Sequence, residues 1–494
     1  MLKKLVIVVF LLLSLKNSFG NNADSGYIVK SNSKHSVIPL HDGPFALIKR
    51  IELIRAAKKS IELEYFIFND DLAGKIVIDE LIKAAKKGVK VRLLLDSMMV
   101  KGKLTPFHIH QIKKNGVDVR FYNDVPLVRA IETQYRDHRK LFIVDDKHLI
   151  IGGRNIANEY FDLDERYNFL DRDIYITGEL VPEITKMFDL FWFSKPSSVV
   201  KRPMRPNLNM LEYLSSSSSS RSRILKKHRS DLRAWKQKVK KAKKFLKKHP
   251  LVKETLSNLF ERRGDAFTSF KKDKSLSCNR PVFVSDPPLT GPSNDKNRKL
   301  RKYVYLELAK AKELVTIDSP YFIMTHGSDN FVKDILKKGV EVELLTNGIY
   351  STDALPVASV FNFYLDEWID AGLRPTVYGG KRDDDTVWLL DRVKSTRWGT
   401  HSKSIVFDSE TSMIGTFNFD PRSAFYSAEI SLFCYESKEL AENTRANIYH
   451  RMKNGKTILT KEQAKEYRFE NVNLMKKMGY YIISPLALLL QRLL

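Results

Sequence analysis

The sequence contains one polar pattern twice, each time inside an apolar stretch. Residues 137–155 read DHRKLFIVDDKHLIIGGRN, and residues 400–418 read THSKSIVFDSETSMIGTFN. Five residue types recur at identical spacing, with an offset of 263 residues: His138/His401, Lys140/Lys403, Asp145/Asp408, Gly152/Gly415 and Asn155/Asn418. A match of this length predicts that the chain holds two copies of one domain.

Other segments support the duplication and indicate an α/β fold. Residues 48–96 alternate helical and strand patterns: IKRIELIRAAKK, SIELEYFIF, GKIVIDELIKAAKKG and VKVRLLLD. Parts of this run return later, because SIELEYFIF resembles LVTIDSPYFIM at 314–324 and KKGVKVRLLLD resembles KKGVEVELLTN at 337–347. Such alternation is typical of layered α/β domains with a partly parallel sheet.

Each repeated stretch is predicted to form a β-hairpin with a two-residue turn, at 146–147 and 409–410. This register places each His opposite its Asn, 17 residues later. The His and Lys of one copy lie two residues apart and therefore share a strand face. Asp145 and Asp408 lie on the other face, so we expect a structural role for them. Gly152 and Gly415 would let a ligand approach the backbone.

Two sets of His, Lys and Asn suit displacement at a phosphodiester. One His can attack phosphorus while the other protonates the leaving oxygen, and the Lys and Asn side chains can hold the phosphoryl oxygens. This chemistry needs no metal or cofactor. The sequence shows no convincing cluster of metal ligands, and its two cysteines, Cys278 and Cys434, can form at most one bridge.

The ends of the chain and its charge suggest export and an anionic partner. Residues 1–20, MLKKLVIVVFLLLSLKNSFG, are typical of a signal peptide, with an uncleaved anchor as the alternative. We therefore expect a periplasmic or secreted, membrane-associated protein. The net charge of +26 favours nucleic acid or an anionic membrane as partner. The tail YYIISPLALLLQRLL reads as a docked segment or an interfacial foot.

A basic segment separates the two copies. Six serines at 215–220 predict a flexible joint. Residues 221–248 then hold 14 Lys and Arg against one acidic residue, with apolar residues at helical spacing: Leu232, Trp235, Val239, Ala242 and Leu246. This predicts a basic amphipathic helix. It would either bind anionic lipid headgroups or cover one edge of a domain as a solvated helix.

The two motifs resemble the paired HxKxxxxD motifs of the phospholipase D superfamily, especially bacterial cardiolipin synthase-like and phospholipase D-like proteins. Further stretches that carry the resemblance are YFIFNDDLAG, GGRNIANEYF, FLDRD, FDLFWFS, SDPP, SPYF, LLTNGIYSTD and GTFNFDPRS. The resemblance implies two α/β/α sandwiches with mixed, largely parallel sheets. They would be related by a pseudo-two-fold axis, with one active site at their interface.

The resemblance also implies a ping-pong mechanism through a phosphohistidine. We expect His138 to be the nucleophile and His401 the general acid. A carboxylate would orient each His, with Asp173 (or Asp171) and Glu429 as candidates. The predicted domains are residues 21–200 and 281–494, joined by a linker and basic insert at 201–280.

The leading functional hypothesis is metal-independent hydrolysis or transphosphatidylation of phospholipids, of the phospholipase D or cardiolipin synthase type. One alternative is an exported endonuclease of the same superfamily that acts on DNA or RNA. The other is a non-catalytic protein that binds lipids or polyanions. No obligate protein partner is inferred.

Overall fold

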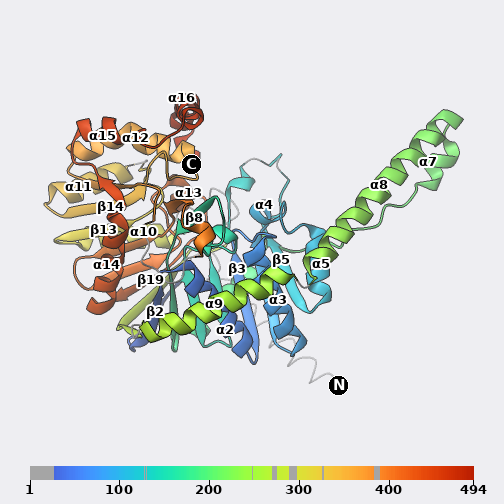
Figure 1. Ribbon diagram of the computed structural model, residues 1–494, viewed down its shortest axis with the longest axis horizontal. Helices are drawn as coiled ribbons and strands as arrows, with labels where there is room; N and C mark the ends of the chain where they lie inside the picture. The colour runs from blue at the N-terminus through green and yellow to red at the C-terminus, as the bar shows by residue number, and fades with distance from the viewer. Residues whose placement is uncertain are drawn as a thin grey trace, which may run out of the picture.

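The computed structural model describes residues 27–126, 128–129, 131–247, 249–269, 275–288, 298–324, 327–382 and 390–494, without the side chains of 262–269. Residues 1–20, predicted as a signal peptide, lie outside these ranges. Two nine-stranded sheets form the centre of the molecule (Figure 1). The first contains, in spatial order, β10 (Ser197–Val199), β5 (Val117–Tyr122), β4 (Lys90–Asp96), β3 (Ser60–Tyr65), β6 (Leu141–Val144), β7 (His148–Gly152), β9 (Asp173–Thr177), β2 (His35–Leu40) and β11 (Leu276–Cys278).

The second sheet repeats this order. It contains β20 (Gly455–Thr457), β15 (Arg374–Tyr378), β14 (Glu341–Asn347), β13 (Leu314–Asp318), β17 (Ser404–Phe407), β18 (Thr411–Gly415), β19 (Ile430–Tyr435), β12 (Arg280–Ser285) and β1 (Tyr27–Lys30). The predicted duplication of an α/β domain is therefore confirmed. Among the described strands, parallel pairing is confined to β3–β4–β5, β13–β14–β15 and the short pair of β8 (Tyr167–Leu170) with β16 (Arg397–Thr400), so the sheets are mixed but not largely parallel.

Helices cover both faces of the two sheets. The helices of the first half are α2 (Gly43–Ala56), α3 (Leu72–Lys86), α4 (Ser97–Val100), α5 (Pro106–Lys114) and α6 (Leu180–Trp192). Those of the second half are α10 (Lys299–Lys310), α11 (Ser328–Lys337), α12 (Leu355–Asp370), α13 (Pro421–Phe425), α14 (Lys438–Met452), α15 (Lys461–Tyr467) and α16 (Leu474–Leu489). One hydrophobic core packs α6 against residues of both sheets, such as Ile143 and Ile430, so the halves share buried apolar surface.

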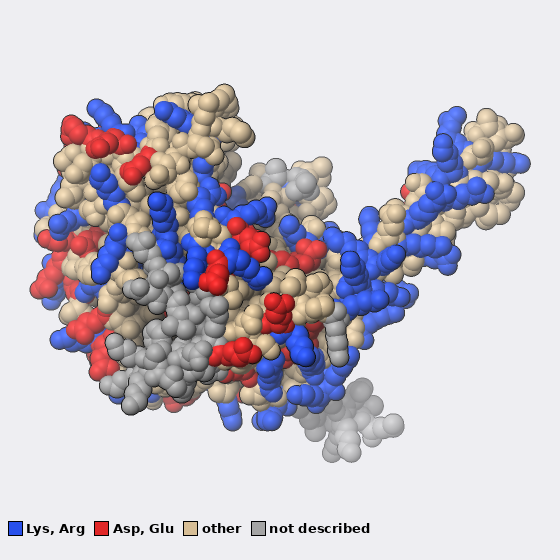
Figure 2. Space-filling view, in the orientation of Figure 1, with Lys and Arg blue, Asp and Glu red and all other residues tan. Residues whose placement is uncertain are grey.

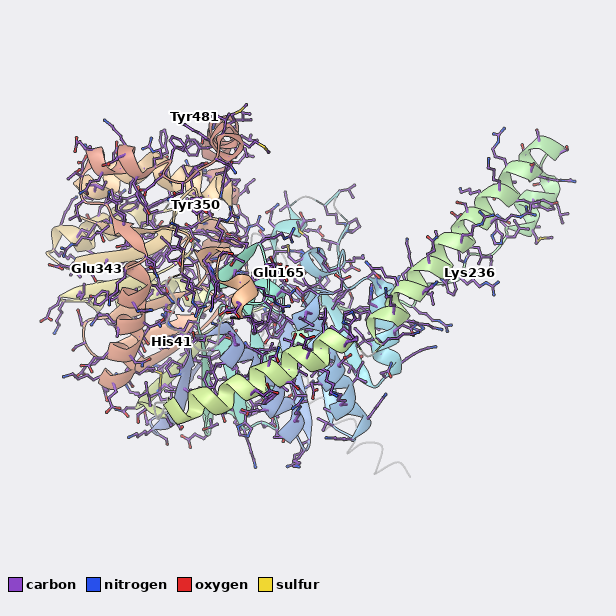
Figure 3. The ribbon with its side chains drawn as sticks, viewed as in Figure 1. His41, Glu165, Lys236, Glu343, Tyr350 and Tyr481 are labelled. Carbon is purple, nitrogen blue, oxygen red and sulfur yellow. A yellow bond between two sulfur atoms is a disulfide. The ribbon has the colours of Figure 1, made fainter. Side chains whose placement is uncertain are left out.

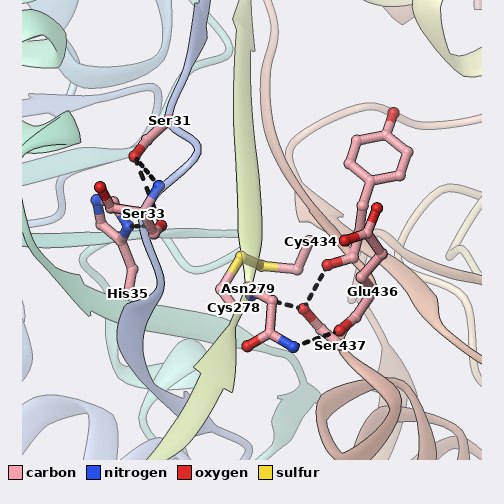
Figure 4. The surroundings of a disulfide bond; sticks show 9 residues. Ser31, Ser33, His35, Cys278, Asn279, Cys434, Glu436 and Ser437 are labelled. Carbon is pink, nitrogen blue, oxygen red and sulfur yellow. Dashed lines mark hydrogen bonds between the residues drawn. A yellow bond between two sulfur atoms is a disulfide. The ribbon is translucent and has the colours of Figure 1, made fainter.

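The two halves also exchange edge strands. Strand β1, near the start of the predicted first domain, pairs with β12 in the second sheet. Strand β11, at the end of the predicted linker, pairs with β2 in the first sheet. A disulfide between Cys278 of β11 and Cys434 of β19 connects the two sheets at this point (Figure 4). The sheets are thus joined covalently and by exchanged strands.

The segment between the halves is helical rather than a flexible joint. It forms α7 (Met210–Ser215), α8 (Ser218–Phe245) and α9 (Pro250–Ser269). The serine run supplies the turn after α7 and the first turn of α8, where Ser217 precedes the helix. The predicted amphipathic helix is confirmed as α8. Its C-terminal part packs on α5 through Phe107–Trp235 and His108–Phe245 ring contacts, and the rest of α8 extends away from the body (Figure 1).

No helix within the described ranges is both long and apolar enough to span a bilayer.

Candidate active site

Each repeated motif forms a hairpin, but with a different register from the predicted one. Val144 pairs with His148 and Phe407 with Thr411, so the turns contain three residues, 145–147 and 408–410. Asp145 and Asp408 begin these turns with left-handed backbone, at φ 56° and 46°. The predicted two-residue turns were wrong because Asp tolerates this conformation and adds a residue to the turn. His138 and His401 therefore do not lie opposite their Asn residues.

Asp145 and Asp408 lie away from the imidazoles and bind backbone. Asp145 accepts hydrogen bonds from the N–H groups of residues 58–60 at 2.6–2.9 Å. Asp408 accepts from those of residues 312–314 at 2.9–3.2 Å. Each carboxylate thereby ties its hairpin to the start of a neighbouring strand, β3 or β13, which is a structural position.

Gly152 and Gly415 make room for a neighbouring strand rather than for a ligand. A Cβ on Gly152 would lie 2.4 Å from the carbonyl oxygen of Arg172, and one on Gly415 would lie 2.3 Å from that of Ile430. Gly152 pairs with Asp173 of β9, and Gly415 pairs with Ser431 of β19. The expected approach of a ligand at these glycines is therefore corrected to close strand packing.

Two short parallel pairings between the halves assemble the site. Strand β8 (Tyr167–Leu170) of the first half pairs with β16 (Arg397–Thr400) of the second, with Leu170 beside Thr400. An equivalent bridge joins Asp137 to Ala428. The residue that follows each of these four paired residues is either a His or an acidic residue. Because neighbouring strands keep a fixed spacing, the backbone pairing places His401 beside Asp171 and His138 beside Glu429.

Glu429 binds His138 from the opposite half. Nδ1 of His138 lies 3.0 and 2.9 Å from the two carboxylate oxygens of Glu429. Glu429 also accepts hydrogen bonds from the hydroxyls of Thr416 and Ser423, and the edge of Phe66 packs on the imidazole with ring centroids 4.8 Å apart. The predicted partner Glu429 is therefore in contact, and it fixes the proton of His138 on Nδ1.

Asp171, the alternative candidate, holds His401 in the same way. Its Oδ2 lies 2.7 Å from Nδ1 of His401. Asp173, the first candidate, was wrong as a His partner: it forms an ion pair with Arg50 at 2.8 Å and accepts the backbone N–H of Arg154. Residues two apart on a strand share a face, but Asp173 lies opposite Gly152 within the sheet, away from the interface.

The two lysines lie next to their histidines in a buried setting. Lys140 Nζ donates to the carbonyl oxygen of His138 at 2.7 Å. Lys403 Nζ donates to the carbonyl oxygen of His401 and lies 2.8 Å from its Nδ1 and 3.1 Å from its Nε2. Burial lowers the pKa of Lys140 to about 7 and that of Lys403 to about 8. Each ammonium therefore gains strongly from a bound anion, which would favour its charged form.

Asn155 and Asn418 each carry a buried amide atom that lacks a hydrogen-bond partner of ordinary geometry among the described residues. Asn155 Oδ1 accepts from the N–H of Ile67 at 3.0 Å, which leaves its Nδ2 without one. On Asn418 the atom is Oδ1. Buried amides normally find partners, so these two are suited to a polar ligand.

Burial sets the protonation of the site. Desolvation, and then the positive charges of Lys140 and Lys403, lower the pKa of both histidines well below the ordinary value. Burial also raises the pKa of Glu429 to about 7, although Lys140 opposes the shift. Both imidazoles are thus neutral in the empty site, each with its Nδ1 proton directed at a carboxylate.

Further site residues gave no signal in the sequence. Tyr160 and Phe169 pack on His401 with centroids 5.1 and 4.7 Å away. The hydroxyl of Tyr321 donates to Asp353 at 3.0 Å, and the charge of Asp353 partly opposes the lowering of the Lys403 pKa by burial. These residues lie in stretches that carry the family resemblance, but nothing in one sequence separates them from ordinary core residues.

Comparison with known proteins shows which family the chain resembles. The family model described as "Cardiolipin synthase, PLD-like domain" matches residues 50–192 and 305–452, which leaves α7–α9 between the two matches. An uncharacterised protein of Helicobacter pylori (strain J99) is 30% identical over 438 residues, covering 85% of this chain and 80% of its own. Cardiolipin synthase C of Escherichia coli K12 is 26% identical over 312 residues, covering 62% of this chain and 60% of its own.

A solved structure supports the fold. The crystal structure of phosphatidylserine synthase from Haemophilus influenzae Rd KW20 superposes with a TM-score of 0.61 at 16% identity, covering 94% of this chain and 98% of that one. At this identity the likeness concerns the fold alone. The family match covers more than half of the chain in two spans, and each span contains one complete His, Lys and Asn set. The chain therefore belongs to the phospholipase D superfamily, and within it to the cardiolipin synthase-like family.

Proposed function

We propose that this enzyme transfers or hydrolyses the phosphatidyl group of a phospholipid, without a metal ion, through a phosphohistidine. The observation that carries the proposal is the pair of His–carboxylate contacts between the halves, His138–Glu429 and His401–Asp171. Each contact leaves Nε2 as the reactive nitrogen of its imidazole. The names of the family model and of the Escherichia coli relative, both cardiolipin synthases, support a phospholipid as substrate.

The chemical steps follow from these roles. Nε2 of His138 attacks phosphorus, forming a P–N bond as the P–O bond to the leaving alcohol breaks. His401, protonated once the anionic phosphate has entered, gives its Nε2 proton to the leaving oxygen. In the second step His401 takes a proton from water or an acceptor alcohol, whose oxygen attacks phosphorus and releases His138.

The remaining polar groups would stabilise the phosphoryl oxygens. Lys140 and Lys403 supply positive charge, and Asn155 supplies an amide that has no partner of ordinary geometry among the described residues. In a buried site such groups act in low dielectric, and each is worth about 10²–10³ in rate.

The experiment uses the purified protein with vesicles of phosphatidylglycerol and phosphatidylethanolamine in EDTA. Products are identified by mass spectrometry, beside His401→Ala. A matched control is His148→Ala, because His148 lies on the same hairpin but contacts Tyr175, away from the site. We expect phosphatidic acid or cardiolipin with the wild type and the control only, and the product identifies the acceptor.

Other outcomes would overturn the proposal. Degradation of plasmid DNA in EDTA without lipid turnover would identify a nuclease. Binding to vesicles without turnover of lipid or DNA would identify a binding protein, and lipid turnover by His401→Ala equal to that of the wild type would refute the role of His401.

We also propose that the chain is exported and that α8 binds an anionic membrane surface. Export is supported by residues 1–20 and by the disulfide Cys278–Cys434, because disulfides persist in oxidising compartments. Figure 2 shows Lys and Arg along the extended part of α8. Replacing Lys226, Lys227 and Arg229 by Gln should weaken binding to anionic vesicles, with no change on zwitterionic vesicles.

A further inference from the structure

Helix α16 and the residues after it are largely apolar on both the covered and the exposed side. Residues 474–494, LMKKMGYYIISPLALLLQRLL, contain no acidic residue. The outward side carries a stripe of large apolar side chains, and three of them are 73–81% exposed (Met475, Ile482 and Leu489). We call this stripe the α16 outer face: Leu474, Met475, Met478, Tyr481, Ile482, Leu486 and Leu489.

The opposite side of the helix is an ordinary packed face. Tyr480 and Ala487 are buried, and Ala487 and Ile483 belong to a small core with Val357 and Val360 of α12. Outward and inward residues alternate with helical periodicity. A helix in contact with water on one side normally has polar residues there, so the outer face is unusual for a protein surface. In Figure 2 the surface at the upper edge of the molecule, where Figure 1 places α16, is largely free of charged residues.

Both ends of this segment are attached to residues around the active site. Near its start, Lys476 Nζ donates to the carbonyl oxygens of Tyr350 and Thr352, directly before Asp353. Figure 3 shows Tyr481 at the outer edge of the molecule and Tyr350 beneath it. At its end, the carbonyl oxygen of Leu494 accepts the backbone N–H of Arg422, at 2.9 Å.

Arg422 links this segment to a second exposed apolar group. Its guanidinium donates to Gln134 of the first half at 3.3 Å, and its charge acts on His138. Just before Gln134, Val128 and Ile131 are 91% and 68% exposed. Through Arg422, the end of the α16 segment is therefore linked both to the stretch that carries these two side chains and to the surroundings of His138.

We propose that the α16 outer face, with Val128 and Ile131, inserts into the interface of an anionic phospholipid bilayer and holds the site against it. The 16-residue helix is about 24 Å long, shorter than the hydrocarbon core, and contains Pro485, so it lies along the membrane surface. Lys476, Lys477 and Arg492, with no acidic residue, give the segment the charge that anionic headgroups attract.

This inference rests on the proposed function only for its substrate, and the test separates the two. The variant is Tyr481→Ser/Ile482→Ser/Leu486→Ser/Leu489→Ser. The control removes exposed apolar side chains elsewhere, Leu306→Ser/Val199→Ser, which are 59% and 56% exposed in the native protein. Binding to phosphatidylglycerol vesicles is measured by sedimentation at a salt concentration that weakens the contribution of α8.

We expect the quadruple variant to bind vesicles at least about 30-fold more weakly, because each inserted side chain contributes free energy by leaving water. It should also lose turnover of vesicles while keeping turnover of a monomeric short-chain phosphatidylglycerol. The control should behave like the wild type. Unfolding of the quadruple variant is excluded by its retained turnover of the short-chain lipid.

A second measurement does not depend on activity. Tyr481→Trp provides a fluorophore on the outer face, and brominated lipids should quench it when vesicles are added. Failure of lipid turnover in the wild type, with quenching intact, would refute the proposed function and leave the docking face standing. Absence of quenching would overturn the docking proposal. A wild-type protein that is dimeric in sedimentation velocity, with a monomeric quadruple variant, would also overturn it and would assign the face to a second copy of the chain.

Discussion

Replacing Asp171 by Asn tests whether the contact between the halves controls the proton of His401. The substitution keeps the size of the side chain and the Oδ1 atom that accepts the N–H of Arg172 at 2.7 Å. It puts an NH₂ group where Oδ2 accepts from Nδ1 of His401 at 2.7 Å. An amide donor in that position forces Nδ1 to accept, so the proton of the neutral imidazole moves to Nε2, and this tautomer cannot take the proton of the acceptor in the second step.

The expected loss is large and specific to catalysis. A wrong tautomer, together with loss of the charge that stabilises the imidazolium, costs about 10³–10⁴ in kcat for an equivalent His–carboxylate pair. This corresponds to about 4–5.5 kcal/mol of transition-state stabilisation. KM should change little, because Asp171 is buried behind the imidazole and does not face the substrate. Glu429→Gln should lower kcat by a similar factor. The double variant should lose much less kcat than the product of the two single factors.

The control is Asp173→Asn, two residues away on the same segment. It breaks the buried ion pair with Arg50 and should cost about 3–5 kcal/mol of stability. It should leave kcat of the folded fraction close to that of the wild type. Lipid turnover and chemical denaturation are measured on all variants. Equal loss of kcat in a folded Asp173→Asn protein, or an Asp171→Asn protein within a few-fold of the wild type, would refute the assignment.

Three further predictions concern stability. Burial raises the pKa of Glu429 to about 7, so the folded protein binds this proton more tightly than the unfolded chain does. The free energy of unfolding should therefore fall as pH rises from about 4.5 to 7, by up to about 3 kcal/mol from this group. Denaturation curves of Glu429→Gln should show a flatter pH dependence than those of the wild type. Gly152→Ala and Gly415→Ala should each lower the melting temperature, because the new Cβ meets backbone within 2.4 Å; equal melting temperatures would contradict close strand packing. Cys278→Ser should cost about 2–5 kcal/mol of stability in the absence of reductant, and dithiothreitol should abolish the difference from the wild type.

Much of the fold could be predicted because it depends on local patterns. The apolar run before Asp96 forms β4, because a short continuous apolar run is typical of a buried strand. The basic segment forms α8, because its apolar residues recur at helical spacing. The hairpin register could not be predicted in the same way. A left-handed Asp145 adds one residue to the turn, and nothing in the sequence distinguishes two-residue from three-residue turns when both suit the polar residues present.

The two sets of His, Lys and Asn are visible in the sequence because the chain repeats them, whereas the carboxylates that contact the histidines are not part of the repeated motifs. Aligning the strands after the two hairpins, LDRDIYI with AEISLFC, places Asp171 with Glu429 and Asp173 with Ser431. In the structure the same two positions behave differently. Asp171 and Glu429 immediately follow the short pairings between the halves, and Asp173 and Ser431 lie opposite the glycines of the hairpins.

The arrangement of the site explains why both halves are needed. Each imidazole is fixed by a carboxylate from the other half, so neither half alone has a complete His–carboxylate pair. The exchanged strands β1 and β11 and the disulfide Cys278–Cys434 hold the halves in the one relative position that closes both pairs. A shift of about 1 Å between the sheets would lengthen both hydrogen bonds beyond useful range and leave two buried carboxylates without their partners. Rigid joining of the sheets is therefore part of the catalytic arrangement, because it sets the tautomer of each histidine.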